Sequence, residues 1–285
     1  MDAATMQSAG KYDIETPFDA KRHAICHPGL TLRYTYTQNE IVPLEQLQEN
    51  LYYMRFTTKE SLKRETAETI LRQNGWLSGQ TETFQSEVLR RSVLLHFEPG
   101  EVIYHFGDDL GGIYGLVYGA VAVNTAPPDH GPRLIHLGAV GAWTGEDSFL
   151  TRKPRRLELR ALTQAWLMHL PLEQMDQMAS ADPMVVRNFC QDLMDGVDVL
   201  IRIIHDLQKP DPDRRIASVL QRMTWNGEQP IPLAQTDIGT MACASRRQVN
   251  AALKRFAENG WVKTNYRSIS VLNADKLRRF AAEDH

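Results

Sequence analysis

Side chains that can recognise DNA bases gather at the start of one expected helix. Residues 235–241 predict a short helix, residues 242–244 a tight turn, and Ser245 an N-cap for a second helix over residues 246–259. An Arg side chain pairs bidentately with guanine O6 and N7, and a Gln or Asn side chain pairs with adenine N6 and N7. The candidate DNA contacts are Ser245, Arg246, Arg247, Gln248, Asn250, Lys254, Arg255 and Lys263, of which the last three are expected to lie along the phosphates.

The residues around these candidates have the pattern of a helix-turn-helix followed by a wing. Apolar residues fall on the faces that would hold the two helices together, namely Ile238, Met241, Val249, Leu253 and Phe256. Residues 261–263 and 269–272 flank a polar turn and predict a two-stranded wing. The turn between the two helices carries Cys243 where glycine is the comfortable residue, and a redox role for its thiol is an alternative.

Basic charge is concentrated in the same part of the chain. The 285 residues include 32 Lys or Arg and 35 Asp or Glu, which gives a net charge of −3. Residues 214–285 hold 12 basic and 6 acidic residues, which leaves 20 basic and 29 acidic residues for the first 213. This asymmetry suggests that the basic module binds a polyanion and that the acidic part has a different function.

A long helix is expected between these two parts. Asp182 is its expected N-cap, Pro183 its first residue and Lys209-Pro210 its end. Apolar residues recur along it in alternating steps of three and four, which is the spacing of a two-stranded coiled coil; the alternative is a helix packed on its own domain. The expected dimer interface is Val186, Phe189, Leu193, Leu200, Ile203 and Leu207, with Gly196 as its weak position and Val197 and Ile204 widening the stripe.

Residues 93–170 break into short β-rich runs separated by Gly and Pro. The expected strands are 93–97, 102–105, 115–124, 134–137 and 165–170. The regular placement of Gly and Pro between these strands is typical of an antiparallel sandwich or roll. The predicted fold class is therefore α+β, with an N-terminal antiparallel β-roll of jelly-roll-like type, a long dimerisation helix and a C-terminal winged helix-turn-helix.

Several motifs, in order, resemble the Crp/Fnr superfamily of bacterial transcription regulators. They are residues 97–104, Gly107-Asp108, residues 114–121, Gly145-Glu146 after Gly141, residues 215–217 and residues 245–249. The resemblance runs from about residue 68 to the C-terminus and implies a β-roll of cyclic-nucleotide-binding type. The expected organisation is a loosely ordered extension over 1–57, the roll with flanking helices over 58–182, the dimer helix over 183–209 and the DNA reader over 210–285.

The resemblance also implies a place for an effector pocket. Members that bind cyclic AMP hold its ribose with a Gly-Glu pair, its phosphate with an Arg followed by Ser or Thr, and its adenine with Thr and Ser on the dimer helix. The matching residues here are Gly145, Glu146, Arg156, Leu157, Leu200 and Ile201. The last three offer no hydroxyl, and losing one charge-assisted hydrogen bond costs about 1.5–3 kcal/mol. A cyclic nucleotide is therefore disfavoured, and an ion pair of Glu146 with Arg156 in place of the ligand is an alternative.

Other cofactors have little support in the sequence. The oxygen-sensing branch of the superfamily uses a cluster of cysteines, whereas Cys26, Cys190 and Cys243 lie far apart, so no iron–sulfur cluster is expected. His23 and His27 beside Cys26 lack the fourth ligand that a zinc site prefers. A haem ligand remains an open alternative among His96, His105, His136 and His169.

The function that these features predict is a homodimeric, sequence-specific DNA-binding transcription regulator and not an enzyme. The chain has no P-loop, no G-x-S-x-G, no H-E-x-x-H and no dinucleotide fingerprint. Its expected partners are double-stranded DNA with a palindromic operator, a second copy of itself and RNA polymerase. No signal peptide or membrane-spanning run is apparent, so the cytoplasm is its expected location. The alternative function is a cyclic-nucleotide-binding relay whose output is a protein contact.

Overall fold

The computed structural model describes residues 62–125, 131–223, 231–265 and 268–282. The expected extension over residues 1–57, with His23, Cys26 and His27, lies outside the described residues. In the part that is described, no helix combines the length and the apolar character needed to cross a membrane.

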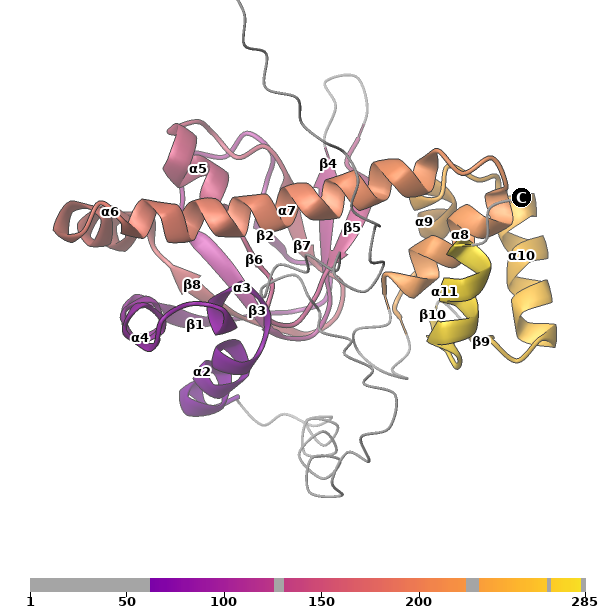
Figure 1. The fold of residues 1–285 in the computed structure, drawn as a ribbon, viewed down its shortest axis with the longest axis horizontal. Coiled ribbons are helices and arrows are strands. Elements are labelled where there is room, and N and C mark those ends of the chain that lie inside the picture. Colours follow the sequence, from indigo (N-terminus) through magenta and orange to yellow (C-terminus); the bar gives the residue numbers. More distant parts are fainter. Residues whose placement is uncertain (1–61, 126–130, 224–230, 266–267, 283–285) are drawn as a thin grey trace, which may run out of the picture.

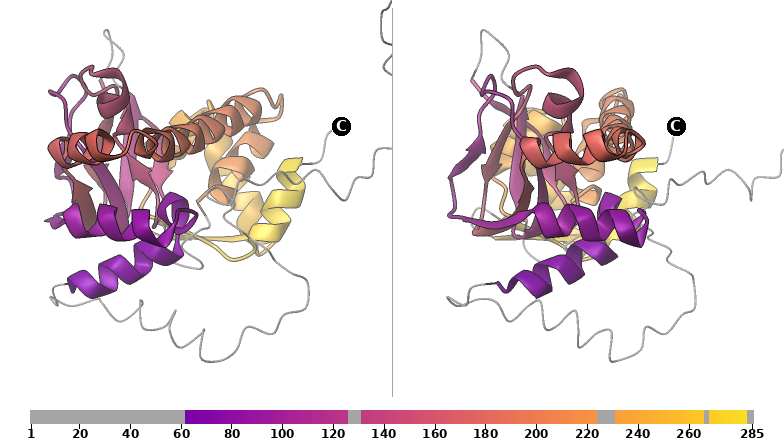
Figure 2. Two further views of the ribbon diagram at one scale, coloured as in Figure 1. Left: turned by 60° about the vertical axis from the view of Figure 1, so that its left-hand side comes forward. Right: turned by 90° about the vertical axis from the view of Figure 1, so that its left-hand side faces the viewer.

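Within the described residues, three helices precede strand β1 and pack against the roll. They are α2 (Arg64–Gln73), α3 (Gly75–Ser78) and α4 (Glu82–Arg91). The Thr81 hydroxyl caps α4 by accepting a hydrogen bond from the Phe84 amide, which satisfies one of the free N–H groups at the helix start. Each helix turns apolar residues toward the strands, so the three helices form one wall of the core of the roll (Figures 1 and 2).

The roll consists of two four-stranded antiparallel sheets. One has the order β1 (Val93–Phe97), β8 (Ala165–Leu170), β3 (Ile113–Tyr118) and β6 (Trp143–Thr144). The other has the order β2 (Val102–Tyr104), β7 (Glu158–Ala161), β4 (Val121–Thr125) and β5 (Arg133–Gly138). The expected strand over 115–124 is two strands, because the chain turns at Gly119, which has φ +92°. A β-carbon there would lie 2.3 Å from the carbonyl oxygen of Gln164, so the turn requires glycine.

Three helices follow within the roll and lead out of it. Helix α5 (Glu146–Thr151) and helix α6 (Leu172–Ala181) flank the strands, and the 23-residue helix α7 (Val185–Leu207) runs from the roll to the C-terminal module (Figure 1). Helix α7 begins two residues later than expected. The reason is that Asp182 ends α6, with its side chain accepting a hydrogen bond from the Met184 amide in the turn between the two helices.

The C-terminal module has its own core. It comprises α8 (Pro212–Gln221), α9 (Gln235–Met241), α10 (Arg246–Glu258), α11 (Ala274–Ala282) and the strands β9 (Val262–Asn265) and β10 (Ser268–Val271). Helix α8 begins with Asp211 as N-cap and Pro212 in the first turn, where proline costs no hydrogen bond. The expected inward residues of the helix-turn-helix are all buried. This core also contacts the roll, because α9 packs on β5 and the cluster includes Ala122 and Leu137.

Candidate DNA-reading surface and effector pocket

The helix-turn-helix is formed by α9, a tight turn and α10. Cys243 in that turn has φ +47°, a left-handed conformation that favours glycine, as the sequence indicated. Ser245 caps α10, because its hydroxyl accepts a hydrogen bond from the Gln248 amide at 3.3 Å. The Gln248 side-chain oxygen in turn accepts from the Ser245 amide at 2.8 Å, which completes a capping box. These bonds fix the start of α10.

The start of α10 presents its polar side chains to solvent. Arg246, Arg247, Gln248 and Asn250 are all exposed, whereas Val249 between them is buried. The structure gives Gln248 a structural role beside the expected base contact, since its side-chain oxygen is engaged in the capping box. The side chains of Arg246, Arg247 and Asn250 form no hydrogen bond to any other described residue. They are the strongest candidates for base recognition.

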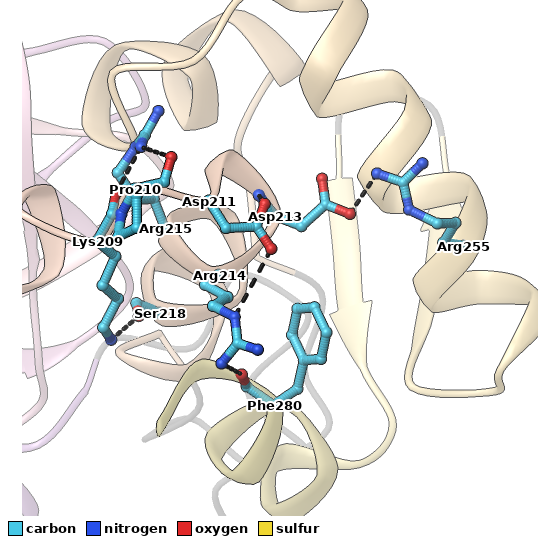
Figure 3. Close-up of polar contacts among 9 residues, drawn as sticks. All are labelled: Lys209, Pro210, Asp211, Asp213, Arg214, Arg215, Ser218, Arg255 and Phe280. Carbon is cyan, nitrogen blue, oxygen red and sulfur yellow. Dashed lines mark hydrogen bonds and ion pairs between the residues drawn. The ribbon is translucent and has the colours of Figure 1, made fainter. Parts of the chain in front are cut away.

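The three expected phosphate contacts differ in how much charge they offer. Lys263 is exposed on the wing strand β9. Lys254 is exposed too and lies 3.8 Å from Glu258, one turn along α10. Arg255 forms an ion pair with Asp213 of α8 (Figure 3). This ion pair joins α10 to α8, and the Asp213 carboxylate offsets part of the charge that Arg255 offers to a phosphate.

Two shallow grooves beside α10 add residues that the sequence analysis missed. One groove, of about 410 Å³, is lined in part by Arg246, Thr236 of α9 and Thr264 and Asn265 of the wing. The other, of about 430 Å³, is lined in part by Asn250, Lys254 and Thr264. Polar residues of the wing thus lie beside the reading helix. The sequence predicted the two strands of the wing. The alternation of residues along a strand does not predict which polar side chains lie beside a neighbouring helix.

In the roll, a buried arginine occupies the place expected for the phosphate-binding residue. The Arg155 side chain donates to the carbonyl oxygens of Gly145 at 2.9 Å and of Gly112 at 2.6 Å, and its guanidinium carbon lies 4.4 Å from the centre of the Tyr104 ring. A β-carbon on Gly145, which has φ +105°, would lie 2.4 Å from Arg155 Nη1. Glycine at position 145 therefore serves both the turn and the approach of this guanidinium.

The expectation that Arg156 fills this place is wrong. Arg156 is exposed and its Nε lies 3.8 Å from Asp147, so the alternative of a Glu146–Arg156 ion pair is wrong as well. The main chain of Arg155 is hydrogen-bonded on both sides to the loop at Gly107 and Asp108. The chain bends at Arg156 and Leu157 before β7; Arg155 is buried, Arg156 is exposed and Leu157 is half-buried.

Acidic side chains from α5 and α7 meet beside this pocket. Glu146, Asp192 and Asp195 are all buried, at 8%, 4% and 8% exposure. Burial raises the pKa of Glu146 to about 7, with Asp147 adding to the rise and Arg155 opposing it. Burial also raises the pKa of Asp192, together with the neighbouring Glu146 and Asp195 and a hydrogen bond to Glu146. Burial and the neighbouring carboxylates therefore both favour the neutral form of Glu146 and Asp192.

Replacing Glu146 by Gln is expected to remove a pH dependence of stability. The raised pKa means that the folded protein binds this proton more tightly than the unfolded chain does. Its contribution is full below about pH 4.5 and is lost as the pH rises to about 7. The free energy of unfolding of the wild type should therefore fall between pH 5 and pH 8. In Glu146→Gln this fall should be smaller by at least about 1.4 kcal/mol, which is the free energy that corresponds to one pKa unit. Urea unfolding at both pH values measures this, with exposed Glu65→Gln as control; equal falls would contradict it.

The long helix α7 exposes a different apolar face from the expected one. We define the α7 stripe as Met194, Leu200, Ile201, Ile204 and Leu207, which are 41–57% exposed. Leu200 and Leu207 were expected at a dimer interface, whereas Leu200 and Ile201 were also expected in the effector pocket. In the described chain Leu200 and Ile201 are both exposed on the α7 stripe. Val186 and Leu193 are half-buried.

Two residues expected at the dimer interface are buried within the chain, which is a correction. Phe189 is 0% exposed and lies within 6 Å, ring centre to ring centre, of Trp76, Phe84 and Phe149. Ile203 is 9% exposed. Phe189 and Ile203 face inward, whereas Gly196 between them is exposed. The apolar residues of α7 therefore lie on two faces of the helix, one buried within the chain and one exposed as the α7 stripe.

Phe189→Leu is therefore expected to destabilise the roll without affecting assembly. Removing part of a ring from a packed aromatic cluster leaves a small cavity and should cost about 1–2 kcal/mol of unfolding free energy. Thermal or urea unfolding measures the loss, and sedimentation measures the oligomeric state. If Phe189→Leu unfolds like the wild type but fails to self-associate, Phe189 lies in the dimer interface and this prediction is wrong.

The four histidines considered as haem ligands lie in separate environments. His169 stacks on Tyr114 at 4.3 Å between ring centres, and burial with nearby Arg155 lowers its pKa to about 4. Burial and Arg222 lower the pKa of His136 to about 4. His96 contacts Gln164, and His105 lies 3.5 Å from Asp108. Within the described ranges no three His, Cys, Asp or Glu side chains are placed to hold a metal ion.

Comparisons with known proteins give the two modules family descriptions. A family model described as a cyclic nucleotide-binding domain matches residues 94–182, and one described as a Crp-like helix-turn-helix domain matches residues 214–280. The chain is 25% identical over 185 residues to the HTH-type transcriptional regulator Cmr of Mycobacterium tuberculosis, which covers 64% of this chain and 73% of that protein.

Two further relatives extend the likeness over both modules. The CRP-like cAMP-activated global transcriptional regulator of M. tuberculosis is 21% identical over 220 residues, covering 74% of this chain and 98% of that protein. Among solved structures, that of FixK2 from Bradyrhizobium japonicum superposes with a TM-score of 0.59 at 18% identity, over 68% of this chain and 99% of that one. The structural likeness supports the fold, and the two matched modules in this order support DNA-binding regulation.

Proposed function

Since the chain belongs to the Crp/Fnr superfamily of bacterial transcription regulators, we propose that it regulates transcription as a homodimer bound to a palindromic DNA site. Each copy would place the start of α10 in a major groove, with Arg246, Arg247 and Asn250 at the base edges. The two grooves would be one helical turn apart, so that two recognition helices related by a two-fold axis read the same sequence on opposite strands.

The observation that carries this proposal is that one chain exposes both a reading helix and the α7 stripe. Five large apolar side chains along one face of a single helix are unusual on a monomer, because each costs free energy while it faces water. Leu193, Val197, Leu200, Ile204 and Leu207 follow one another in alternating steps of four and three, which suits a parallel pair of helices around a two-fold axis. A second copy of α7 is the partner that fits.

We further propose that the roll does not depend on cyclic AMP. The Arg155 guanidinium, which would hold a phosphate, is engaged by two main-chain carbonyls, and Arg156 rather than Ser or Thr follows it. Glu146, which would hold a ribose, is buried near Asp192, and burial favours the neutral form of both carboxyl groups. An anionic ligand would have to break these contacts and approach three acidic side chains. RNA polymerase as a further partner and a cytoplasmic location belong to the same proposal, because both follow from regulating transcription.

A binding titration on duplex DNA tests this proposal against a relay with a protein output. The affinity of the purified full-length protein for a labelled duplex is measured by fluorescence anisotropy at several salt concentrations, with and without cyclic AMP. DNA binding should weaken steeply with salt, since displaced counterions drive it, and cyclic AMP should leave it unchanged. An absence of salt-dependent binding would favour the relay. Binding that appears only with cyclic AMP would overturn the proposal that the roll does not depend on this nucleotide.

A further inference from the structure

One arginine connects the end of the long helix to the turn of the helix-turn-helix. Arg215 on α8 donates to the carbonyl oxygens of Lys209 at 2.6 Å and of Pro210 at 3.1 Å, both in the linker that follows α7 (Figure 3). The same guanidinium donates to the carbonyl oxygens of Ala242 at 2.8 Å and of Cys243 at 3.2 Å, in the turn before α10. Its N–H groups are thus divided between two segments about 30 residues apart.

The two segments that Arg215 joins each need external support. Cys243 adopts a left-handed conformation that side-chain-bearing residues rarely hold without help from their surroundings. The linker is fixed on its other side by Lys209, whose ammonium contacts Asp206 of α7 and Ser218 of α8, both at 2.7 Å. Asp206 also pairs with Arg222, which directly follows α8. The end of α7, α8 and the turn before α10 therefore form one connected unit, with Arg215 as its link to the turn.

We infer that Arg215 is a positioning residue that sets the direction of α10 relative to α7, and thereby the half-site spacing that the protein accepts. The inference rests on the proposed dimer. If two α7 helices fix the two-fold axis, the angle between α7 and α10 decides how far apart the two reading helices lie. Moving one half-site by one base pair rotates it by about 35° around the duplex, so a rigid connection rejects the wrong spacing. A loosened connection tolerates it.

The test compares spacing preference among variants on a palindrome selected by the wild-type protein. Affinity is measured for that palindrome, for versions with one base pair inserted or deleted between the half-sites, and for a duplex with a single half-site. The wild type should prefer the selected spacing by at least about tenfold. In Arg215→Lys the preference should fall below about threefold, because one ammonium on a flexible chain cannot bond four carbonyls in a fixed geometry. The affinity for the single half-site should stay within about threefold of the wild type.

Two controls separate this role from charge and from general stability. Arg278→Ala removes an exposed guanidinium from the same module and should keep the wild-type spacing preference. Arg215→Ala should behave like Arg215→Lys, and where it does not fold at the assay temperature the lysine variant decides. Unchanged spacing preference in Arg215→Lys would overturn the inference, as would an equal loss on the palindrome and the single half-site. Failure of the wild type to select any palindrome would instead overturn the proposed dimer.

Discussion

Aspartate at both Ile201 and Ile204 is expected to make the protein monomeric and to lower its affinity for a palindromic duplex by at least about a hundredfold. Both side chains are more than half exposed on the α7 stripe. Burying an Ile contributes about 1.5–3 kcal/mol, so four such side chains in a dimer contribute on the order of 6–12 kcal/mol as an upper bound. Carboxylates in the same seam would in addition have to lose their hydration.

The loss of DNA affinity follows from the loss of the second reading helix. A monomer binds one half-site, and the second half-site no longer adds its contacts at a high effective concentration. Sedimentation measures the oligomeric state, and anisotropy with the palindrome measures affinity. Arg202→Asp, which puts a carboxylate on an exposed position of α7 outside the stripe, is the matched control. If the double variant remains dimeric, as the control variant should, the α7 stripe is not the dimer interface.

Arg246→Ala is expected to abolish most of the sequence preference in DNA binding. The side chain is exposed in the first turn of α10 and borders the groove that the wing completes. One bidentate pair with guanine is worth about 1–3 kcal/mol of discrimination, and a dimer loses it twice. The expected loss is about 2–6 kcal/mol, which corresponds to roughly thirtyfold to twenty-thousandfold in affinity for the specific site.

Lys254→Ala separates base recognition from attraction to the phosphates. An exposed lysine beside the duplex should weaken specific and non-specific binding alike and reduce the slope of affinity against salt. Arg246→Ala should instead leave non-specific binding nearly unchanged. Competition between the specific duplex and a scrambled duplex measures the ratio. If Arg246→Ala keeps the wild-type preference, Arg246 is not a base contact.

The sequence predicted the architecture well where its signals are local. The capping residue Ser245, the buried side chains of the helix-turn-helix and the turn at Cys243 depend on neighbours within a few positions, and all three are as expected. Strands β1 and β8 have the expected bounds for the same reason. Strand β7 was missed because it has only four residues, and Glu158 and Ala161 are types with low strand propensity.

The errors concern contacts between distant segments. The match to the family motif, ten residues after Glu146, put Arg156 in the pocket, whereas in the structure Arg155 is the buried arginine and its main chain is hydrogen-bonded to the loop at Gly107 and Asp108. Helix α7 has the heptad pattern. Which of its apolar faces is exposed depends on the aromatic cluster around Phe189, to which α3, α4 and α5 each contribute one ring. The pairing of Arg255 with Asp213 likewise joins residues 42 positions apart.

The most direct test of the central claim is a selection from a random pool of duplex DNA by the full-length protein. Two arms run at one fixed salt concentration, one with cyclic AMP and one without it. A dimer that reads DNA without this nucleotide should enrich the same palindromic motif in both arms, with its half-sites about one helical turn apart. Enrichment of a non-palindromic motif would contradict the dimer, and enrichment only in the arm with cyclic AMP would contradict the account of Arg155, Glu146 and Asp192.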